Sequence, residues 1–199
     1  MTRRAKQVPP YVAKSVPRRL LAACQSTTET ALVSLLYRGA LRVGEATALQ
    51  WVSLDLADDP PTLTVGHHWS RDRRSIEAGG KGGKILTIPM GAPLVAALEA
   101  QRPAAGGSPW VFPSPRKPDS PITTKHAWAI LKRVAARSGL DPAKVWPHLL
   151  RHGAAEHQIE AGVTLDEVRD FLRHADIATT GLYLQTNQQR LRRAAEALE

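Results

Sequence analysis

The sequence predicts a mainly α-helical fold with a small antiparallel β-sheet (an α+β fold). Apolar residues, most of them leucine, recur at helical intervals over residues 17–56 and again in the last quarter of the chain. Between these regions, residues 61–90 contain β-prone stretches and many glycines, which are typical of strands and turns. With 199 residues, 43% of them hydrophobic, the chain has enough apolar material for one sizeable core.

The N-terminal quarter is predicted to be an arm followed by helices. Residues 1–16 are rich in basic residues and proline, a composition that disfavours a packed core. We therefore expect a basic extended arm or linker over 1–16 and one domain over 17–199. Between residues 17 and 56 the apolar spacing predicts two or three helices, with Ser26, Thr27 or Thr28 as the cap of the second.

The middle of the chain changes from strands to helices. PTLTV (61–65) and ILTIP (85–89) flank the turn GGKGGK, which predicts antiparallel strands whose turn projects Lys81 and Lys84. A helix is expected over 92–101, then a loop rich in Pro, Gly and Ser over 103–121 that inserts Trp110, Val111 and Phe112 into the core. Another helix is expected over 123–138.

Four helices are predicted in the final quarter. The first runs over 148–161, after Pro147, and Thr164 with Glu167 forms a capping box for the second. The third spans 176–184 and contains Tyr183. The fourth spans 187–198 and has an apolar side.

The charge balance favours a polyanionic partner. The chain has 27 Lys and Arg against 18 Asp and Glu, a formal net charge of +9, so association with a polyanion should be sensitive to salt. Cys24 is the single cysteine, which excludes an internal disulfide and a cysteine-based zinc cluster and favours a reducing compartment. Neither an apolar run of about 20 residues nor a signal peptide is visible, so we expect a cytoplasmic protein without a membrane segment.

A few residues could bind a phosphate, although each alone has an ordinary structural explanation. His148 and Arg151 are three residues apart, so on a helix they share one face and can converge on one phosphate. Arg42 and Glu45 have the same spacing, which alone indicates an intrahelical ion pair. Tyr183, nine residues after His174, would alone be interpreted as a half-buried core residue.

Together these residues lie in four blocks that resemble the tyrosine recombinase, or phage integrase, family. The blocks are ALRVGEATALQWVSLDL, GGKGGKILTIPM, PHLLRHG and LRHADIATTGLYL, and they occur in the family's order. The resemblance implies that residues 17–199 form a catalytic domain, with helices around a three-stranded antiparallel sheet.

The resemblance also implies a site-specific DNA recombinase that needs no metal and no cofactor. Tyr183 would be the nucleophile that forms a 3′-phosphotyrosyl bond, and Lys81 the general acid, with Lys84 as the alternative if the register of the turn differs. Members of the family act as homo-tetramers on two sites of double-stranded DNA. The catalytic residues that the resemblance implies are Arg42 and Arg151, which would clamp the phosphate, His148 and His174, which would assist proton transfer or bind phosphate oxygens, Lys81 and Tyr183.

Three residues depart from the family's pattern. Ala40 and Arg173 stand where glycine is usual, and Gly153 stands where a small hydroxyl residue is common. We expect Arg173 to bring an additional cation beside the site, where it either contacts DNA or points to solvent. About sixteen residues precede the catalytic region, whereas most members carry a DNA-clamping domain there.

Two alternative functions remain open on the sequence. A type IB topoisomerase would share the nucleophile and the arginines, and a non-catalytic DNA-binding protein derived from a recombinase would bind DNA without a covalent step. An HExxH metal site, nucleotide hydrolysis and serine-hydrolase activity are disfavoured, because the chain lacks HExxH, a complete phosphate-binding loop and GxSxG.

Overall fold

The computed structural model describes residues 11–70, 75–78 and 85–173. Four of the residues discussed above, Lys81, Lys84, His174 and Tyr183, lie outside these ranges, as do the two helices expected over 176–198. Within them, the predicted fold class is confirmed: helices dominate, and the strands are short and antiparallel.

The helices follow the predicted order closely. Ser26 caps α2 by accepting a hydrogen bond from the amide of Glu29 at 3.2 Å, and Thr164 and Glu167 form the expected capping box of α7. The helices are α1 (Ser15–Ala22), α2 (Thr27–Tyr37), α3 (Val43–Thr47), α4 (Ala92–Gln101), α5 (Thr124–Arg137), α6 (Pro147–Glu160) and α7 (Leu165–Leu172), with short 3₁₀ turns η1 (Trp51–Ser53), η2 (Pro103–Ala105) and η3 (Pro142–Lys144).

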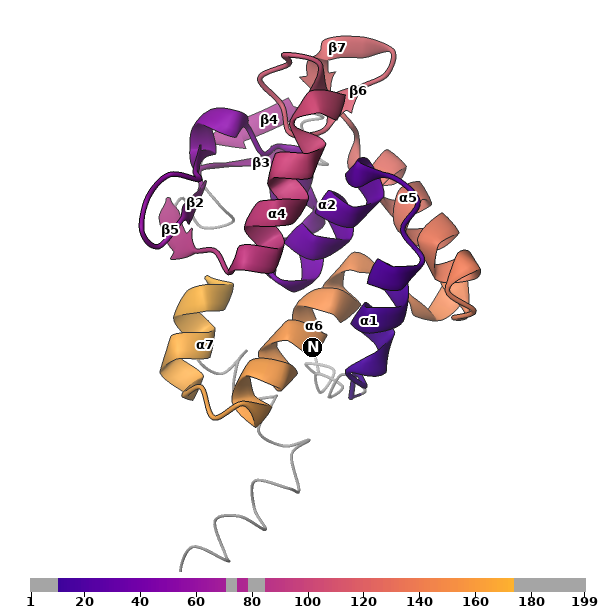
Figure 1. Cartoon of the computed structure of the whole chain (residues 1–199), viewed down its shortest axis with the longest axis vertical. Helices are drawn as coiled ribbons and strands as arrows, with labels where there is room; N and C mark the ends of the chain where they lie inside the picture. Colours follow the sequence, from indigo (N-terminus) through magenta and orange to yellow (C-terminus); the bar gives the residue numbers. More distant parts are fainter. Residues whose placement is uncertain (1–10, 71–74, 79–84, 174–199) are drawn as a thin grey trace, which may run out of the picture.

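Helix α2 is the centre of the molecule (Figure 1). Six consecutive residues from Ala31 to Leu36 are buried, so this helix is covered on all sides and contacts α1, α4, α5 and α6. Trp110, Val111 and Phe112 are buried as predicted, and Val111 and Phe112 belong to the same core.

The three-stranded antiparallel sheet that the resemblance implies is present. Strand β2 (Thr62–Val65) pairs antiparallel with β5 (Leu86–Pro89), placing Leu63 opposite Ile88. The third strand is β1 (Leu54–Asp55), on the other edge of β2. A separate hairpin joins β3 (His67–Ser70) to β4 (Ser75–Ala78).

One predicted loop contains regular structure. Residues 103–121, expected to be irregular, include η2 and the hairpin of β6 (Pro113–Ser114) and β7 (Lys117–Pro121). Proline cannot donate to a ladder, but β6 and β7 form a sheet of only these two strands, so their prolines can lie at positions that need no donor.

The segment before α1 packs against α6. Val12 is 2% exposed, its amide donates to Glu156 Oε2 at 2.9 Å, and His157 Nε2 lies 2.7 Å from its carbonyl oxygen. Gly153 leaves the room for this contact, since a Cβ at that position would lie 3.0 Å from Val12 Cγ1. This packing gives a structural reason for glycine where the family commonly has a hydroxyl residue.

Candidate active site

The turn between α2 and α3 carries Arg42 into the site. Gly39 allows the chain to fold back here, because a Cβ would lie 2.8 Å from Leu41 Cδ1 and 2.9 Å from the carbonyl oxygen of Leu35. Ala40 follows with φ of 44°, in the left-handed region, and its methyl group is fully buried. The turn therefore sets both the direction of Arg42 and the position of the Ala40 carbonyl.

Arg42 and Glu45 form the ion pair that their spacing predicts. Arg42 Nη1 donates to Glu45 Oε1 at 2.6 Å, and the Arg42 amide donates to Glu45 Oε2 at 2.8 Å. The Arg42 side chain is 25% exposed, whereas that of Glu45 is 1% exposed. The carboxylate is thus the inner partner, and the arginine remains accessible to an anion.

Arg151 reaches the same place from α6. Arg151 is 3% exposed, and its Nη1 and Nη2 donate to the carbonyl oxygens of Ala40 and Leu172, respectively. Because Ala40 precedes Arg42 by two positions, these bonds bring Arg151 beside Arg42, although 111 residues separate Ala40 from Arg151 in the sequence. Two predicted phosphate ligands are therefore neighbours in the fold.

His148 lies one helical turn before Arg151 on α6, at an exposed position. Its ring and that of His152 pack edge to face, with centroids 5.9 Å apart. Burial, together with the nearby charges of His148 and Arg151, lowers the pKa of His152 to about 4. His152 is therefore neutral at physiological pH, which suits a packing role beside the more exposed His148.

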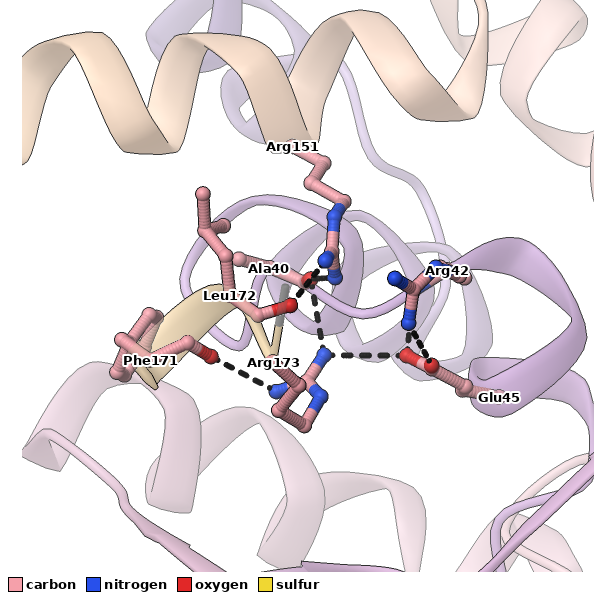
Figure 2. Close-up of polar contacts among 7 residues, drawn as sticks. All are labelled: Ala40, Arg42, Glu45, Arg151, Phe171, Leu172 and Arg173. Carbon is pink, nitrogen blue, oxygen red and sulfur yellow. Dashed lines mark hydrogen bonds and ion pairs between the residues drawn. The ribbon is translucent and has the colours of Figure 1, made fainter. Parts of the chain in front are cut away.

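Arg173 is a third arginine in the cluster (Figure 2). Its Nη2 donates to the Ala40 carbonyl oxygen and to Glu45 Oε2, both at 3.1 Å, and its Nη1 donates to the Phe171 carbonyl oxygen at 3.1 Å. The side chain is 5% exposed. The expectation that it points to solvent is wrong, because these acceptors compensate for the burial of the guanidinium group.

Glu45 holds these cations together as their common anion. Burial opposes its ionisation, but the charges of Arg173, Arg42 and Arg151 keep its pKa below the ordinary value. Three guanidinium groups and one carboxylate leave a formal net charge of +2 in a small volume. Such a cluster can bind an anion with several oxygens, such as a phosphate diester.

The sequence identified part of this cluster. It predicted Arg42, Arg151 and Glu45, and the structure brings them together, with His148 on the same helix as Arg151. The carbonyl of Ala40 as a shared acceptor was not predicted, and the buried role of Arg173 was missed. Its substitution for a glycine was the available signal.

Among the residues that the structure describes, no three His, Cys, Asp or Glu side chains gather as a metal ion would require. In the same part of the chain, no helix has the length and apolar character needed to span a bilayer.

Comparison with known proteins agrees with the fold. The phage integrase family model matches residues 11–190. The tyrosine recombinase XerC of Xanthomonas campestris pv. campestris is 35% identical over 169 residues, which cover 85% of this chain and 48% of that protein. This chain belongs to the phage integrase family, as the resemblance of its four blocks indicates.

Solved structures share the same architecture. The crystal structure of XerA recombinase superposes with a TM-score of 0.77 at 26% identity, covering all of this chain and 66% of that one. The Tn1549 transposon integrase, in complex with a circular intermediate DNA, gives a TM-score of 0.78 at 18% identity over 98% of this chain and 67% of that one. The chain spans about half the length of the XerC relative.

Proposed function

We propose that the chain carries the catalytic function of a site-specific DNA recombinase, which cleaves and rejoins strands through a 3′-phosphotyrosyl intermediate. The observation that carries the proposal is the convergence of Arg42 and Arg151 around the Ala40 carbonyl and Glu45. Membership of the phage integrase family supports the same conclusion. The family's relatives named above are recombinases and an integrase.

In the proposed reaction, the Tyr183 hydroxyl attacks the scissile phosphorus. A bond forms between phosphorus and the Tyr183 oxygen, whose proton passes to His148 or to water, and the bond from phosphorus to the 5′-oxygen breaks. Lys81 protonates the departing 5′-oxygen, and the phosphate now links Tyr183 to the 3′-oxygen of the strand. A tyrosine hydroxyl has a pKa near 10, so it needs nearby positive charge to react at neutral pH. Reversal of the step by another 5′-hydroxyl rejoins the strand without an external energy source.

The arginines supply the positive charge in this proposal. Arg42 and Arg151 bind the non-bridging oxygens and stabilise the charge that develops on them in the transition state. His148 and His174 assist proton transfer or donate to phosphate oxygens. Glu45 and the Ala40 carbonyl fix the guanidinium groups before DNA arrives, so little reorganisation is needed during the reaction.

Double-stranded DNA is the proposed partner, and α5 offers a basic surface for its backbone. A hollow of about 530 Å³ is lined by Arg116, Lys125, His126 and Arg133. Lys125, Ala129 and Arg133 are four residues apart, so they share one face of α5. Together with the net charge of +9, this face favours phosphate contacts.

We further propose that four copies act on two DNA sites. Each copy would supply one nucleophile, Tyr183, and exchange between two duplexes requires cleavage of four strands. A tetramer provides one nucleophile for each strand, which matches the stoichiometry of the chemistry.

Covalent trapping tests the proposed reaction. The 199-residue chain is incubated, in the presence of a chelator, with nicked duplexes tiled across the DNA that flanks its own gene. The proposal predicts a denaturation-resistant protein–DNA adduct for the unmodified chain and none for Tyr183→Phe. DNA binding by both proteins is measured in parallel.

The other two tyrosines provide matched controls. The Tyr37 hydroxyl lies 2.8 Å from His157 Nδ1, and burial raises its pKa. Burial, and then a hydrogen bond with Glu160, raise the pKa of Tyr11. Neither is suited to attack, so Tyr11→Phe and Tyr37→Phe should still form the adduct.

Covalent trapping, together with a plasmid relaxation assay, separates the two alternative functions. A chain that binds the duplexes but forms no adduct would be a non-catalytic DNA-binding protein. Relaxation of a supercoiled plasmid that lacks any of the tiled sequences would instead identify a topoisomerase.

A further inference from the structure

Arg173 lies between the two groups that hold the predicted phosphate-binding arginines. The Ala40 carbonyl accepts hydrogen bonds from Arg151 Nη1 and Arg173 Nη2, while the Glu45 carboxylate accepts from Arg42 Nη1 and Arg173 Nη2. Arg173 therefore contacts both anchors at once, and Figure 2 shows its guanidinium group between them.

The backbone at this position is unfavourable for an arginine. Arg173 ends α7 with φ of 55° and ψ of 43°, a left-handed conformation in which glycine is preferred because it has no Cβ. In the described part of the chain, the non-glycine residues with positive φ are Ala40 and Arg173. The two are joined by the hydrogen bond from Arg173 Nη2 to the Ala40 carbonyl.

These two residues are also the ones that depart from the family's glycines. When a residue other than glycine adopts a left-handed backbone, the cost has to be offset by side-chain contacts that glycine cannot make. For Arg173 those contacts are the carbonyls of Ala40 and Phe171 and the carboxylate of Glu45. These contacts connect the end of α7 to the turn that carries Arg42, to α3 and to α7 itself.

Burial argues against a direct contact between Arg173 and DNA. Its side chain is 5% exposed, against 25% for Arg42, so an approaching phosphate meets Arg42 first. Its Nε is buried and has no hydrogen-bond partner among the described residues, so within them Nη1 and Nη2 make the contacts of the guanidinium group.

We propose that Arg173 is a positioning residue that fixes Glu45 and the Ala40 carbonyl, and through them holds Arg42 and Arg151 in the geometry that binds the scissile phosphate. The inference rests on the proposed function, because it concerns the same site. Arg173 thus acts through other residues and does not contact the substrate.

Single-turnover adduct formation on saturating nicked duplex is the first test. Arg173→Gln should slow the step by roughly tenfold to a hundredfold, because small displacements of positioned groups have effects of that size. DNA affinity should change by less than about threefold, since the exposed arginine is retained. Arg173→Lys keeps the charge but lacks the planar fork, so it should restore only part of the rate.

Two further variants separate positioning from folding. Arg173→Gly suits the left-handed backbone, which offsets part of the stability lost with the ion pair to Glu45, so it should be more stable than Arg173→Gln and yet be as slow. Arg137→Gln removes an ion pair with the buried Glu29, at a distance from this cluster in the fold, and should leave the rate unchanged. A rate for Arg173→Gly equal to that of the unmodified chain would overturn the proposal.

The pH profile gives a readout that a purely structural role would not change. Glu45 faces Arg42 from its own helix, Arg151 from α6 and Arg173 from the end of α7. Loss of Arg173 removes the largest of these charge effects, so the pKa of Glu45 should rise and the acidic limb of the rate profile should move to higher pH. Profiles that differ only by a constant factor would contradict the proposal.

The effect of Arg173 on Glu45 can be measured without the reaction. If the unmodified chain forms no adduct, the proposed function fails, and the titration of Glu45 becomes the test. The side-chain carboxyl ¹³C signal, assigned with Glu45→Gln, should titrate at higher pH in Arg173→Gln than in the unmodified chain. An unchanged midpoint would show that Arg173 does not hold Glu45.

Discussion

At the scale of single residues, the ion pair between Glu45 and Arg42 contributes more to stability than their spacing of three residues alone indicates. An exposed Arg and Glu pair three residues apart contributes only about 0.3–0.5 kcal/mol. Here the carboxylate is 1% exposed and pairs with both Arg42 and Arg173. Removing one partner of such a buried group costs more, about 3–5 kcal/mol, because the other charges are left uncompensated. The contact therefore matters to the fold as well as to the site.

His152 makes the stability of the fold depend on pH within a defined range. Its pKa is about 4 in the folded chain, because burial, together with the charges of His148 and Arg151, opposes protonation. In the unfolded chain the group takes up a proton near pH 6.5. Between about pH 6.5 and 4 the unfolded state binds the additional proton, so stability falls as pH falls, by at most about 1.4 kcal/mol per pH unit.

His152→Gln should remove this contribution. We expect the free energy of unfolding, measured by urea denaturation across pH 4–7, to depend less steeply on pH in His152→Gln than in the unmodified chain. His126→Gln, at an exposed position, is the control and should keep the original slope. Equal slopes in all three proteins would show that His152 protonates as readily in the folded state as in the unfolded one.

At the scale of secondary-structure elements, capping signals gave the helices most reliably. Ser26, one of the three candidates for its helix, and Thr164 each accept a backbone hydrogen bond at the start of the helix that follows. Such caps act locally, so the sequence alone indicates them. Thr123, expected as the first residue of its helix, is instead the cap of α5. Pro147 likewise marks the start of α6, where its missing N–H costs nothing.

Other elements depend on distant partners, so their positions along the chain were not predictable, although the resemblance implied a sheet of three strands. Strand β1 is two residues long and exists through its pairing with β2, so it has no periodicity of its own. The β6–β7 hairpin lies in a segment rich in proline, which disfavours strands. The position of Arg173 depends on two acceptors far away in the sequence, Ala40 in the α2–α3 turn and Glu45 in α3.

The α7 cap connects local stability to the site. Thr164→Ala should lower the free energy of unfolding by about 1 kcal/mol, the usual cost of losing such a cap, as measured by urea denaturation. Because α7 ends at Arg173, the variant should also slow adduct formation. Thr123→Ala removes the comparable cap of α5 and should cost similar stability without this effect. Equal rates in the two variants would mean that α7 does not position the site.

At the scale of the whole molecule, the site joins segments that are distant in the sequence. The α2–α3 turn supplies Arg42, α6 supplies Arg151 and the end of α7 supplies Arg173. Ala40 packs with Ala154, Ala155, Ile159, Val168 and Leu172 in a small core between α6 and α7. This core holds the three segments together, and a helical pattern in the sequence does not reveal it.

The basic face of α5 should contribute to DNA affinity without contributing to the chemistry. Lys125→Ala and Arg133→Ala should each lower the slope of log affinity against log salt concentration by about 1, as expected for the loss of one phosphate contact. Fluorescence anisotropy with a labelled duplex measures this. Lys14→Ala removes a lysine that pairs with Glu160 at 3.0 Å and should leave the slope unchanged. A slope unaffected by either α5 variant would place the DNA elsewhere.

The most direct test of the proposed recombinase chemistry is to identify the residue that becomes linked to DNA. The trapped adduct is digested with protease and nuclease, and the modified peptide is sequenced by mass spectrometry. The proposal predicts a nucleotide joined through its 3′-phosphate to Tyr183. A link to Tyr11, Tyr37 or a residue that is not tyrosine, or a link through a 5′-phosphate, would contradict it.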